Sequence, residues 1–275
     1  MGGHNIKLVL SDIDGTILPY GQHVVSERMR AAMHRCLDAG IRVGPASGRG
    51  ISHVAPAFGG DDALIATALG TNGMQVHLDG RLIHEELLDH AALEHVLDAI
   101  DGLPGVGAIV FDLEGRPLLV RGRREDLVES FPIYAQEALD RTRIPEHPII
   151  KMNVFVAGGM GRTRATFDHV SREVPELDFN IPVAGFLNIT PVGYSKATGV
   201  DILCEALGIG IEQVVVFGDS GNDVEMLAHV PNSAAVQDAS DEATAAARWH
   251  IGPCERDAVA DVLDALAQGE WPFGS

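Results

Sequence analysis

The sequence predicts an α/β protein in which a doubly wound parallel sheet carries an inserted, smaller α+β unit. Short apolar runs alternate with helical patterns at both ends of the chain, which is typical of a parallel sheet with crossover helices. The middle of the chain instead mixes helical patterns with hairpin-like strands. With 275 residues the chain is long enough for two domains and a sizeable core.

The first third predicts the opening strands and helix of the parallel sheet. Apolar runs at 6–10, 41–46 and 63–69 have the length and composition of buried strands. Between the first two runs, apolar residues recur at helical spacing. That helix begins after Ser26, which is a good N-cap residue, and ends at Gly40.

The middle and last thirds differ in character, and we expect the chain to leave the parallel sheet and return to it. The predicted core is 1–84 with 186–275, and the predicted inserted unit is 85–185. The middle elements are helices at 85–100, 126–139 and 163–174, a hairpin of 108–112 and 118–121 around Glu114-Gly115, and strands at 149–156 and 179–189. The returning elements are helices at 196–207, 223–229 and 258–267 and strands at 214–217 and 234–236.

Composition and charge exclude several classes of partner. Hydrophobic residues make up 46% of the chain and charged residues 21%, as in an ordinary globular protein. No apolar run is long enough to span a bilayer, and no export signal precedes the first strand, so we expect a cytoplasmic protein without a membrane partner. A net charge of -19 predicts no attraction to nucleic acid or anionic lipid.

Metal chemistry based on sulfur or histidine also lacks support. The three cysteines, Cys36, Cys204 and Cys254, are widely spaced, which favours neither a disulfide framework nor a thiolate zinc site. The sequence contains no HExxH and no P-loop pattern, so zinc hydrolysis and nucleotide hydrolysis by a P-loop are disfavoured.

Polar residues follow three of the predicted parallel strands at the point where each strand ends. The first strand leads into Asp12-Ile13-Asp14-Gly15-Thr16, the second into Ser47, and the strand at 214–217 into Gly218-Asp219-Ser220-Gly221-Asn222-Asp223. Ligands of open parallel sheets bind beyond the carboxyl ends of the strands. We therefore expect four aspartates, at 12, 14, 219 and 223, to converge there.

Such a cluster requires a counter-charge. Two like charges about 4 Å apart repel by about 4 kcal/mol at an effective dielectric near 20. Carboxylates without nearby His or Cys suit a hard cation, and Mg²⁺ fits best. Lys196 adds a positive charge at a predicted helix start, where backbone N–H groups also favour an anion. Together these features predict a site for a phosphate group.

In these residues the chain resembles the haloacid dehalogenase superfamily of phosphatases. More narrowly it resembles the Cof-type branch, which has a Rossmann-like core and a large inserted α+β cap. The resemblance covers nearly the whole chain, and the four motifs occur in family order. They read DxDGT at Asp12 to Thr16, a Ser or Thr at Ser47, a Lys at Lys196, and GDxxND at Gly218 to Asp223.

The resemblance implies a role for each of these residues. Asp12 would be the nucleophile, because a carboxylate with a reference pKa of about 3.9 is ionised without a base. Asp14 would protonate the leaving oxygen and then deprotonate water, so it must hold a proton near neutrality. Mg²⁺ would be bound by Asp12, the backbone carbonyl of Asp14, Asp219 and Asp223. The phosphate contacts would be Ser47, Gly48, Arg49, Lys196 and Asn222.

The function implied by the resemblance is a Mg²⁺-dependent phosphatase with an aspartyl-phosphate intermediate. Its partner would be a small phosphorylated metabolite, in particular a sugar phosphate. Two alternatives remain at this point. A phosphomutase would return the phosphoryl group to another hydroxyl of the substrate, and a binding protein would keep the fold without turnover. The sequence names neither the substrate, nor the oligomeric state, nor the choice between Mg²⁺ and Mn²⁺.

Overall fold

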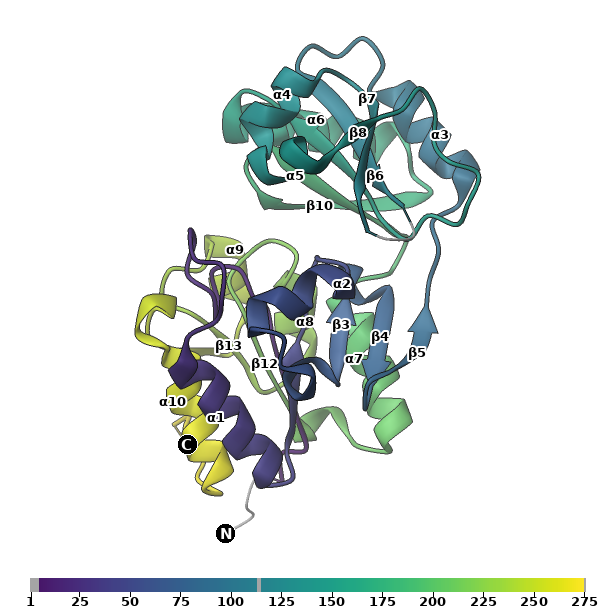
Figure 1. The fold of residues 1–275 in the computed structure, drawn as a ribbon. Coiled ribbons are helices and arrows are strands. Elements are labelled where there is room, and N and C mark those ends of the chain that lie inside the picture. Colours follow the sequence, from purple (N-terminus) through teal and green to yellow (C-terminus); the bar gives the residue numbers. More distant parts are fainter. Residues whose placement is uncertain (1–4, 113–114, 275) are drawn as a thin grey trace. The chain divides into compact units, whose positions relative to one another are not determined.

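The computed structural model describes residues 5–112 and 115–274, and the contacts within it divide the chain into two units (Figure 1). The core unit consists of Met1–Glu85 and Ser195–Ser275, and the cap unit of Glu86–Tyr194. The second boundary therefore lies at 194 and not at the predicted 185. The reason is the strand β11 (Phe186–Pro191), which pairs with two other cap strands.

The core unit is built on a five-stranded parallel sheet with the order β14-β13-β12-β1-β2. The chain leaves β1 on one side to form β2, and later returns on the other side to form β12. The edge between β1 and β12 is therefore a topological switch point, where α/β sheets bind ligands. The strands are β1 (Leu8–Ser11), β2 (Arg42–Pro45), β12 (Val214–Gly218), β13 (Ser233–Ala235) and β14 (Trp249–His250).

Helices cover both faces of this sheet, which explains why its strands are continuous apolar runs. Val9 and Val215 pack in the cluster that contains α1 (Glu27–Asp38) and α10 (Ala258–Ala267), and these two helices lie side by side (Figure 1). Leu10 and Val216 point the other way. The helices on that face are α7 (Lys196–Leu207), α8 (Val224–His229) and α9 (Asp241–Ala246).

The predicted strand at 63–69 is shorter than expected and joins a different sheet. Residues Asp62–Ile65 form a 3-10 turn, and β3 covers Ala68–Gly70. β3 pairs antiparallel with β4 (Gln75–Leu78), which pairs with β5 (Arg81–Glu85). A parallel bridge between Ala46 and Leu69 links β3 to the end of β2. The short helix α2 (Ile51–Val54) precedes this region.

The cap unit contains a six-stranded sheet with the order β10-β11-β9-β6-β7-β8. The predicted hairpin is present as β6 and β7, which pair antiparallel, although Glu114 of its turn lies outside the described residues. The predicted helix at 126–139 is two helices, because Pro132 cannot continue the first one. The strands are β6 (Val106–Phe111), β7 (Pro117–Arg121), β8 (Leu139–Asp140), β9 (Met152–Val156) and β10 (Leu177–Val183). The helices are α3 (His90–Ala99), α4 (Arg124–Ser130), α5 (Pro132–Glu137) and α6 (Gly159–Glu173).

One face of the cap sheet changes from apolar to polar along its strands. Phe155 and Phe186 pack there against α4 and α5. On the same face, Asn153, Asn188 and Asn180 lie opposite one another on β9, β11 and β10. We call these three residues the amide row. Asn153 Nδ2 donates to Asn188 Oδ1 (2.9 Å), and Asn188 Nδ2 donates to Asn180 Oδ1 (3.0 Å).

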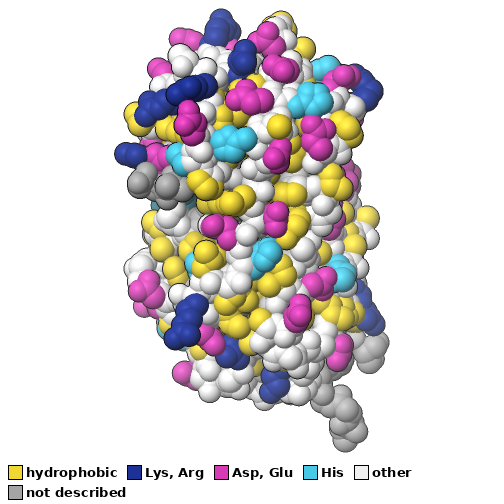
Figure 2. All heavy atoms as spheres, turned by 90° about the vertical axis from the view of Figure 1, so that its right-hand side faces the viewer, with side chains coloured by type: hydrophobic (Ala, Val, Ile, Leu, Met, Phe, Trp, Pro, Cys, Tyr) yellow, Lys and Arg dark blue, Asp and Glu magenta, His cyan; other side chains and the backbone are white. Residues whose placement is uncertain are grey.

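One face of the molecule shows acidic side chains that are dispersed over it (Figure 2). On the face drawn in Figure 2, acidic and histidine side chains are interspersed with hydrophobic ones, in keeping with the net charge of -19. Within residues 5–112 and 115–274, every helix is too short or too polar to cross a bilayer.

Candidate active site

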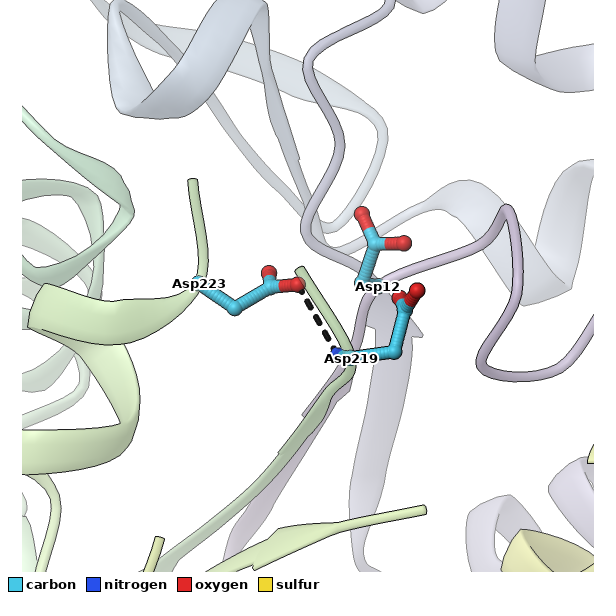
Figure 3. Close-up of side chains that lie close together, drawn as sticks. All are labelled: Asp12, Asp219 and Asp223. Atoms are coloured by element: carbon cyan, nitrogen blue, oxygen red, sulfur yellow. Dashed lines mark hydrogen bonds between the residues drawn. The ribbon is translucent and has the colours of Figure 1, made fainter. Parts of the chain in front are cut away.

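Three aspartate side chains meet at the switch point of the core sheet (Figure 3). Asp12 follows β1, Asp219 follows β12, and Asp223 immediately precedes α8. The parallel pairing continues past β1, where Asp12 N donates to Phe217 O (2.9 Å). All three side chains are buried, and one carboxylate oxygen from each lies within 4.8 Å of those of the other two.

A tight turn between β12 and α8 fixes the position of Asp223. Its Oδ2 accepts hydrogen bonds from the backbone N–H groups of Asp219 and Ser220, both at 3.1 Å. A Cβ at Gly218 would lie 2.6 Å from both Cβ and Cγ of Asp223. A glycine at 218 is therefore required for the carboxylate to fold back against the end of the strand.

Lys196 supplies a positive charge inside the cluster. It is the first residue of α7, after the N-cap Ser195, whose side chain forms a capping box with Thr198. The side chain is fully buried, and its Nζ donates to Asp12 Oδ1 (2.5 Å) and Asp223 Oδ1 (2.6 Å). The helix start therefore places one ammonium group between two of the three carboxylates.

The electrostatics of the cluster show an excess of negative charge. Burial raises the pKa of Asp219 to about 7, and the neighbouring Asp223 adds to this shift. Burial also raises the pKa of Asp12 well above its usual range, although Lys196 opposes the shift. Burial alone would lower the pKa of Lys196, but the carboxylates of Asp12 and Asp223 raise it above its usual value. Each shift favours a bound proton, so one ammonium group does not balance the cluster.

A divalent cation fits this donor set. Three buried carboxylates and one buried ammonium leave negative charge that a cation would neutralise. The ligand atoms are all oxygens, which suits Mg²⁺, Mn²⁺ or Ca²⁺ better than a soft metal. The three buried carboxylates therefore form an acidic cluster that could hold a hard divalent cation.

Asp14 does not join the cluster, contrary to the expectation that four aspartates converge. Its side chain is 42% exposed and forms an ion pair with Arg49. Arg49 Nε donates to Asp14 Oδ2 (2.8 Å), and Arg49 Nη2 donates to the other oxygen, so the contact is bidentate. Asp14 lies three residues past the end of β1, and the next residue, Gly15, has a φ of 89°.

The loop after β2 contains Ser47, Gly48 and Arg49. Ser47 is buried, its N–H donates to Leu69 O (2.8 Å), and its Oγ accepts from the N–H of Arg49 (3.1 Å). Gly48 lies between them in the same loop. These contacts hold the loop against the end of β3 and place its backbone beside the strand ends.

Asn222 already has protein partners on both ends of its amide group. Its Nδ2 donates to Asn72 Oδ1 (3.0 Å), and its Oδ1 accepts from Ser220 Oγ (2.8 Å). The predicted contact of Asn222 with phosphate remains a prediction.

Asn72 is a site residue that sequence reasoning missed. It is buried, its N–H donates to Ser47 O (2.9 Å), and its φ of 55° is unusual for a residue other than glycine. Thr71, with a φ of 51°, shares this backbone. Strained backbone of this kind is typical of functional sites. The available signal was the polar stretch Thr71-Asn72-Gly73 directly after an apolar run.

Thr16 and Tyr20 were also missed as contacts of the cluster. Both donate hydrogen bonds to the carboxylate of Asp219 from the loop that follows β1. Thr16 belongs to the DxDGT motif, whereas nothing in the sequence marks Tyr20, because its contact spans 199 positions of the chain.

Comparison with known families adds an independent result. Residues 9–263 match the family described as haloacid dehalogenase-like hydrolase. The chain belongs to this family. The fold agrees with the Cof-type branch, which has an inserted cap, and this hydrolase is an enzyme, a phosphatase of the haloacid dehalogenase type.

Two curated relatives of this hydrolase are phosphatases. The 5-amino-6-(5-phospho-D-ribitylamino)uracil phosphatase YbjI of Escherichia coli is 27% identical over 277 residues, covering 98% of this chain and 99% of the relative. The HMP-PP phosphatase of Klebsiella pneumoniae is 26% identical, covering 82% and 81%.

Solved structures share the fold of this hydrolase over nearly its whole length. The protein SMU.1108c of Streptococcus mutans matches with a TM-score of 0.84 and 20% identity, covering 96% of this chain and 99% of the other. The subclass IIB sugar phosphatase BT4131 matches with a TM-score of 0.80 and 20% identity, covering 94% and 98%.

Proposed function

We propose that this enzyme is a Mg²⁺-dependent phosphatase that hydrolyses small phosphomonoesters, among them sugar phosphates, through a phosphoryl group carried on Asp12. The observation that carries the proposal is the buried contact of Lys196 with Asp12 and Asp223, beside the third carboxylate of Asp219. Membership of a hydrolase family supports this interpretation.

Asp12 is the proposed nucleophile. A carboxylate oxygen of Asp12 forms a bond to phosphorus while the bond from phosphorus to the leaving oxygen breaks. Lys196 holds Oδ1 of Asp12 at 2.5 Å, and therefore fixes the orientation of the attacking group. It also contributes positive charge where the transferring phosphoryl group is negative.

Asp14 is the proposed acid and base. In the first half of the reaction it gives a proton to the leaving oxygen. In the second half it takes a proton from water, whose oxygen bonds to phosphorus while the bond to Asp12 breaks. This restores the Asp12 carboxylate and releases inorganic phosphate. Asp14 lies outside the cluster and is partly exposed, so a leaving oxygen and water can reach it, but it must leave its ion pair with Arg49 before it can hold a proton.

The proposed cation ligands are Asp12, Asp219, Asp223 and the backbone carbonyl of Asp14. When bound, Mg²⁺ supplies a positive charge that stabilises the charge of the transferring group. The proposed phosphate contacts are Ser47, Gly48, Arg49, Lys196 and Asn222. Arg49 and Asn222 engage protein partners here, so a phosphate would have to share or replace these hydrogen bonds.

The amide row of the cap and the neighbouring Thr190 contain polar atoms that lack a hydrogen-bond partner in the described part of the chain. Asn153 Oδ1 and Thr190 Oγ1, on neighbouring strands, are buried and have no hydrogen-bond partner among the described residues. A buried polar atom without a partner destabilises the protein by about 1–3 kcal/mol, so this part of the cap is a candidate for a functional role. The names of three of the similar proteins describe phosphatases of small phosphorylated metabolites, one of them a sugar phosphatase. These names support a small phosphorylated metabolite, such as a sugar phosphate, as the substrate.

The test is the release of inorganic phosphate from p-nitrophenyl phosphate by the intact chain with Mg²⁺, with a chelator, and with Asp12→Asn. We expect turnover that requires the metal, and a loss on the order of 10³-fold or more in Asp12→Asn. The exposed Asp98 on α3 provides a matched control, since Asp98→Asn should retain full activity.

Two outcomes would contradict specific parts of the proposal. Turnover that survives in Asp12→Asn would show that another group is the nucleophile, and turnover that survives the chelator would remove the metal from the mechanism. A panel of sugar phosphates then separates hydrolysis from the mutase alternative, because a mutase yields an isomeric sugar phosphate in place of inorganic phosphate.

A further inference from the structure

Tyr20 connects the exposed surface of the core unit with a buried carboxylate of the site. The residue is 66% exposed, whereas Asp219 is only 5% exposed. Nevertheless the Tyr20 hydroxyl donates a hydrogen bond to Asp219 Oδ2 at 3.3 Å. An exposed aromatic ring gains little from burial, so apolar packing does not explain why this side chain lies over the site.

The backbone at Gly15 leaves room for this contact. Gly15 has a φ of 89°, and a Cβ at this position would lie 2.5 Å from Asp219 Oδ2 and 2.8 Å from the Tyr20 hydroxyl. The space that a side chain would fill is the space in which hydroxyl and carboxylate meet.

The second oxygen of Asp219 has a donor from the same loop. Thr16 Oγ1 donates to Asp219 Oδ1 at 2.8 Å. The loop after β1 therefore supplies one hydroxyl to each oxygen of a single carboxylate, which fixes the plane of the group. Each carboxylate oxygen has two acceptor positions, so each keeps one for a cation.

We propose that Tyr20 is a positioning residue for the divalent cation, and that with Thr16 it orients the Asp219 carboxylate for metal binding. The inference rests on the proposed function, because it requires that Asp219 is a metal ligand. Hydrogen-bonding partners of ligand side chains commonly change metal affinity by about 10- to 100-fold.

The test is a calorimetric titration of Mg²⁺ into the intact chain without substrate, comparing wild type with Tyr20→Phe. We expect the Kd for Mg²⁺ to rise about tenfold in Tyr20→Phe. The melting temperature without metal should change little, because the ring and its exposure are kept. Tyr194→Phe is the matched control: its hydroxyl donates to Glu86 (3.0 Å) within the cap unit, and its Kd should equal that of wild type.

The possible results are distinguishable. An unchanged or smaller Kd in Tyr20→Phe would overturn the inference while leaving the proposed phosphatase intact. A smaller Kd would mean that the hydroxyl competes with the cation for Asp219. If the wild-type chain bound no Mg²⁺, the metal assignment and this inference would both fall. A melting temperature that drops with no change in Kd would assign Tyr20 a purely structural role.

Discussion

The positively charged side chain of Lys196 is fully buried. Its two carboxylate partners, Asp12 and Asp223, lie within 2.6 Å of its Nζ. Buried charges are expensive unless each has a partner. The residue therefore serves the stability of the core unit as well as the proposed chemistry.

Replacing Lys196 with Met should lower both activity and stability. Removing one member of a buried ion pair typically costs about 3–5 kcal/mol, because the partners are left without a counter-charge. We expect a loss of this size in the free energy of unfolding, measured by denaturant titration, together with loss of phosphatase activity. Saturating Mg²⁺ should restore part of the lost stability, because the cation neutralises the same carboxylates.

The exposed Lys7 provides the control for this substitution. Lys7→Met should change the free energy of unfolding by less than about 0.5 kcal/mol, as is usual for surface positions. If Lys196→Met were as stable as wild type without metal, the buried carboxylates would have to be neutral through bound protons. The electrostatic balance described here would then be wrong.

At the scale of the element, burial decided which segments could be predicted. β1 and β12 are apolar on both faces, and their runs of Leu and Val identify them without ambiguity. The break between α4 and α5 follows from Pro132, whereas the pairing of β11 depends on contacts with distant strands. Local periodicity does not reveal which strands pair. The sequence therefore predicts a return to the core at 186, whereas the structure has it at 195.

A substitution in the amide row tests whether these residues recognise the substrate. Asn153→Leu keeps the approximate volume of the side chain but removes its hydrogen-bonding atoms. If the row recognises substrate hydroxyls, kcat/KM for the best sugar phosphate of a panel should fall at least about tenfold, while p-nitrophenyl phosphate is turned over as before. The measurement is the ratio of the two kcat/KM values in wild type and variant.

A structural role for Asn153 would give a different result. The variant leaves Asn188 Oδ1 without its donor, so some loss of stability is expected, on the order of 1 kcal/mol. If both substrates lost activity in the same proportion, the row would support the cap without reading the substrate. A thermal melt run beside the assays separates the two cases.

For the whole molecule, the three cysteines report on the packing of the core unit. All three thiols are free and buried. Burial raises the pKa to about 12 for Cys36, about 11 for Cys204 and about 12 for Cys254. Only the thiolate reacts rapidly with a disulfide reagent. At pH 8 the native chain should therefore label very slowly, and the unfolded chain should release three equivalents.

Rapid labelling of the native chain would contradict the burial of these thiols. Labelling that accelerates in denaturant would measure the unfolding of the core unit. The unfolded chain is the internal control, since it must react completely under the same conditions.

Much of the candidate site was predictable, because Asp12, Lys196 and Asp219 follow strands or begin a helix that the sequence marks clearly. The contact of Tyr20 with Asp219 and that of Asn72 with Asn222 were not predictable. They join side chains 199 and 150 positions apart, and no local pattern distinguishes these residues from ordinary loop residues.

The insertion of the cap within the core has a consequence for synthesis of the chain. Asp12 and Lys196 are separated by 184 positions, and β1 must wait for β12 before its second edge is paired. During translation the cap, a continuous segment, emerges completely while β1 still has an open edge. The proposed nucleophile is therefore synthesised before the cap, and its charged partner only after the whole cap. Closure of the parallel sheet and completion of the ion cluster are one late event, so a nascent chain acquires its chemistry only when its core is nearly finished.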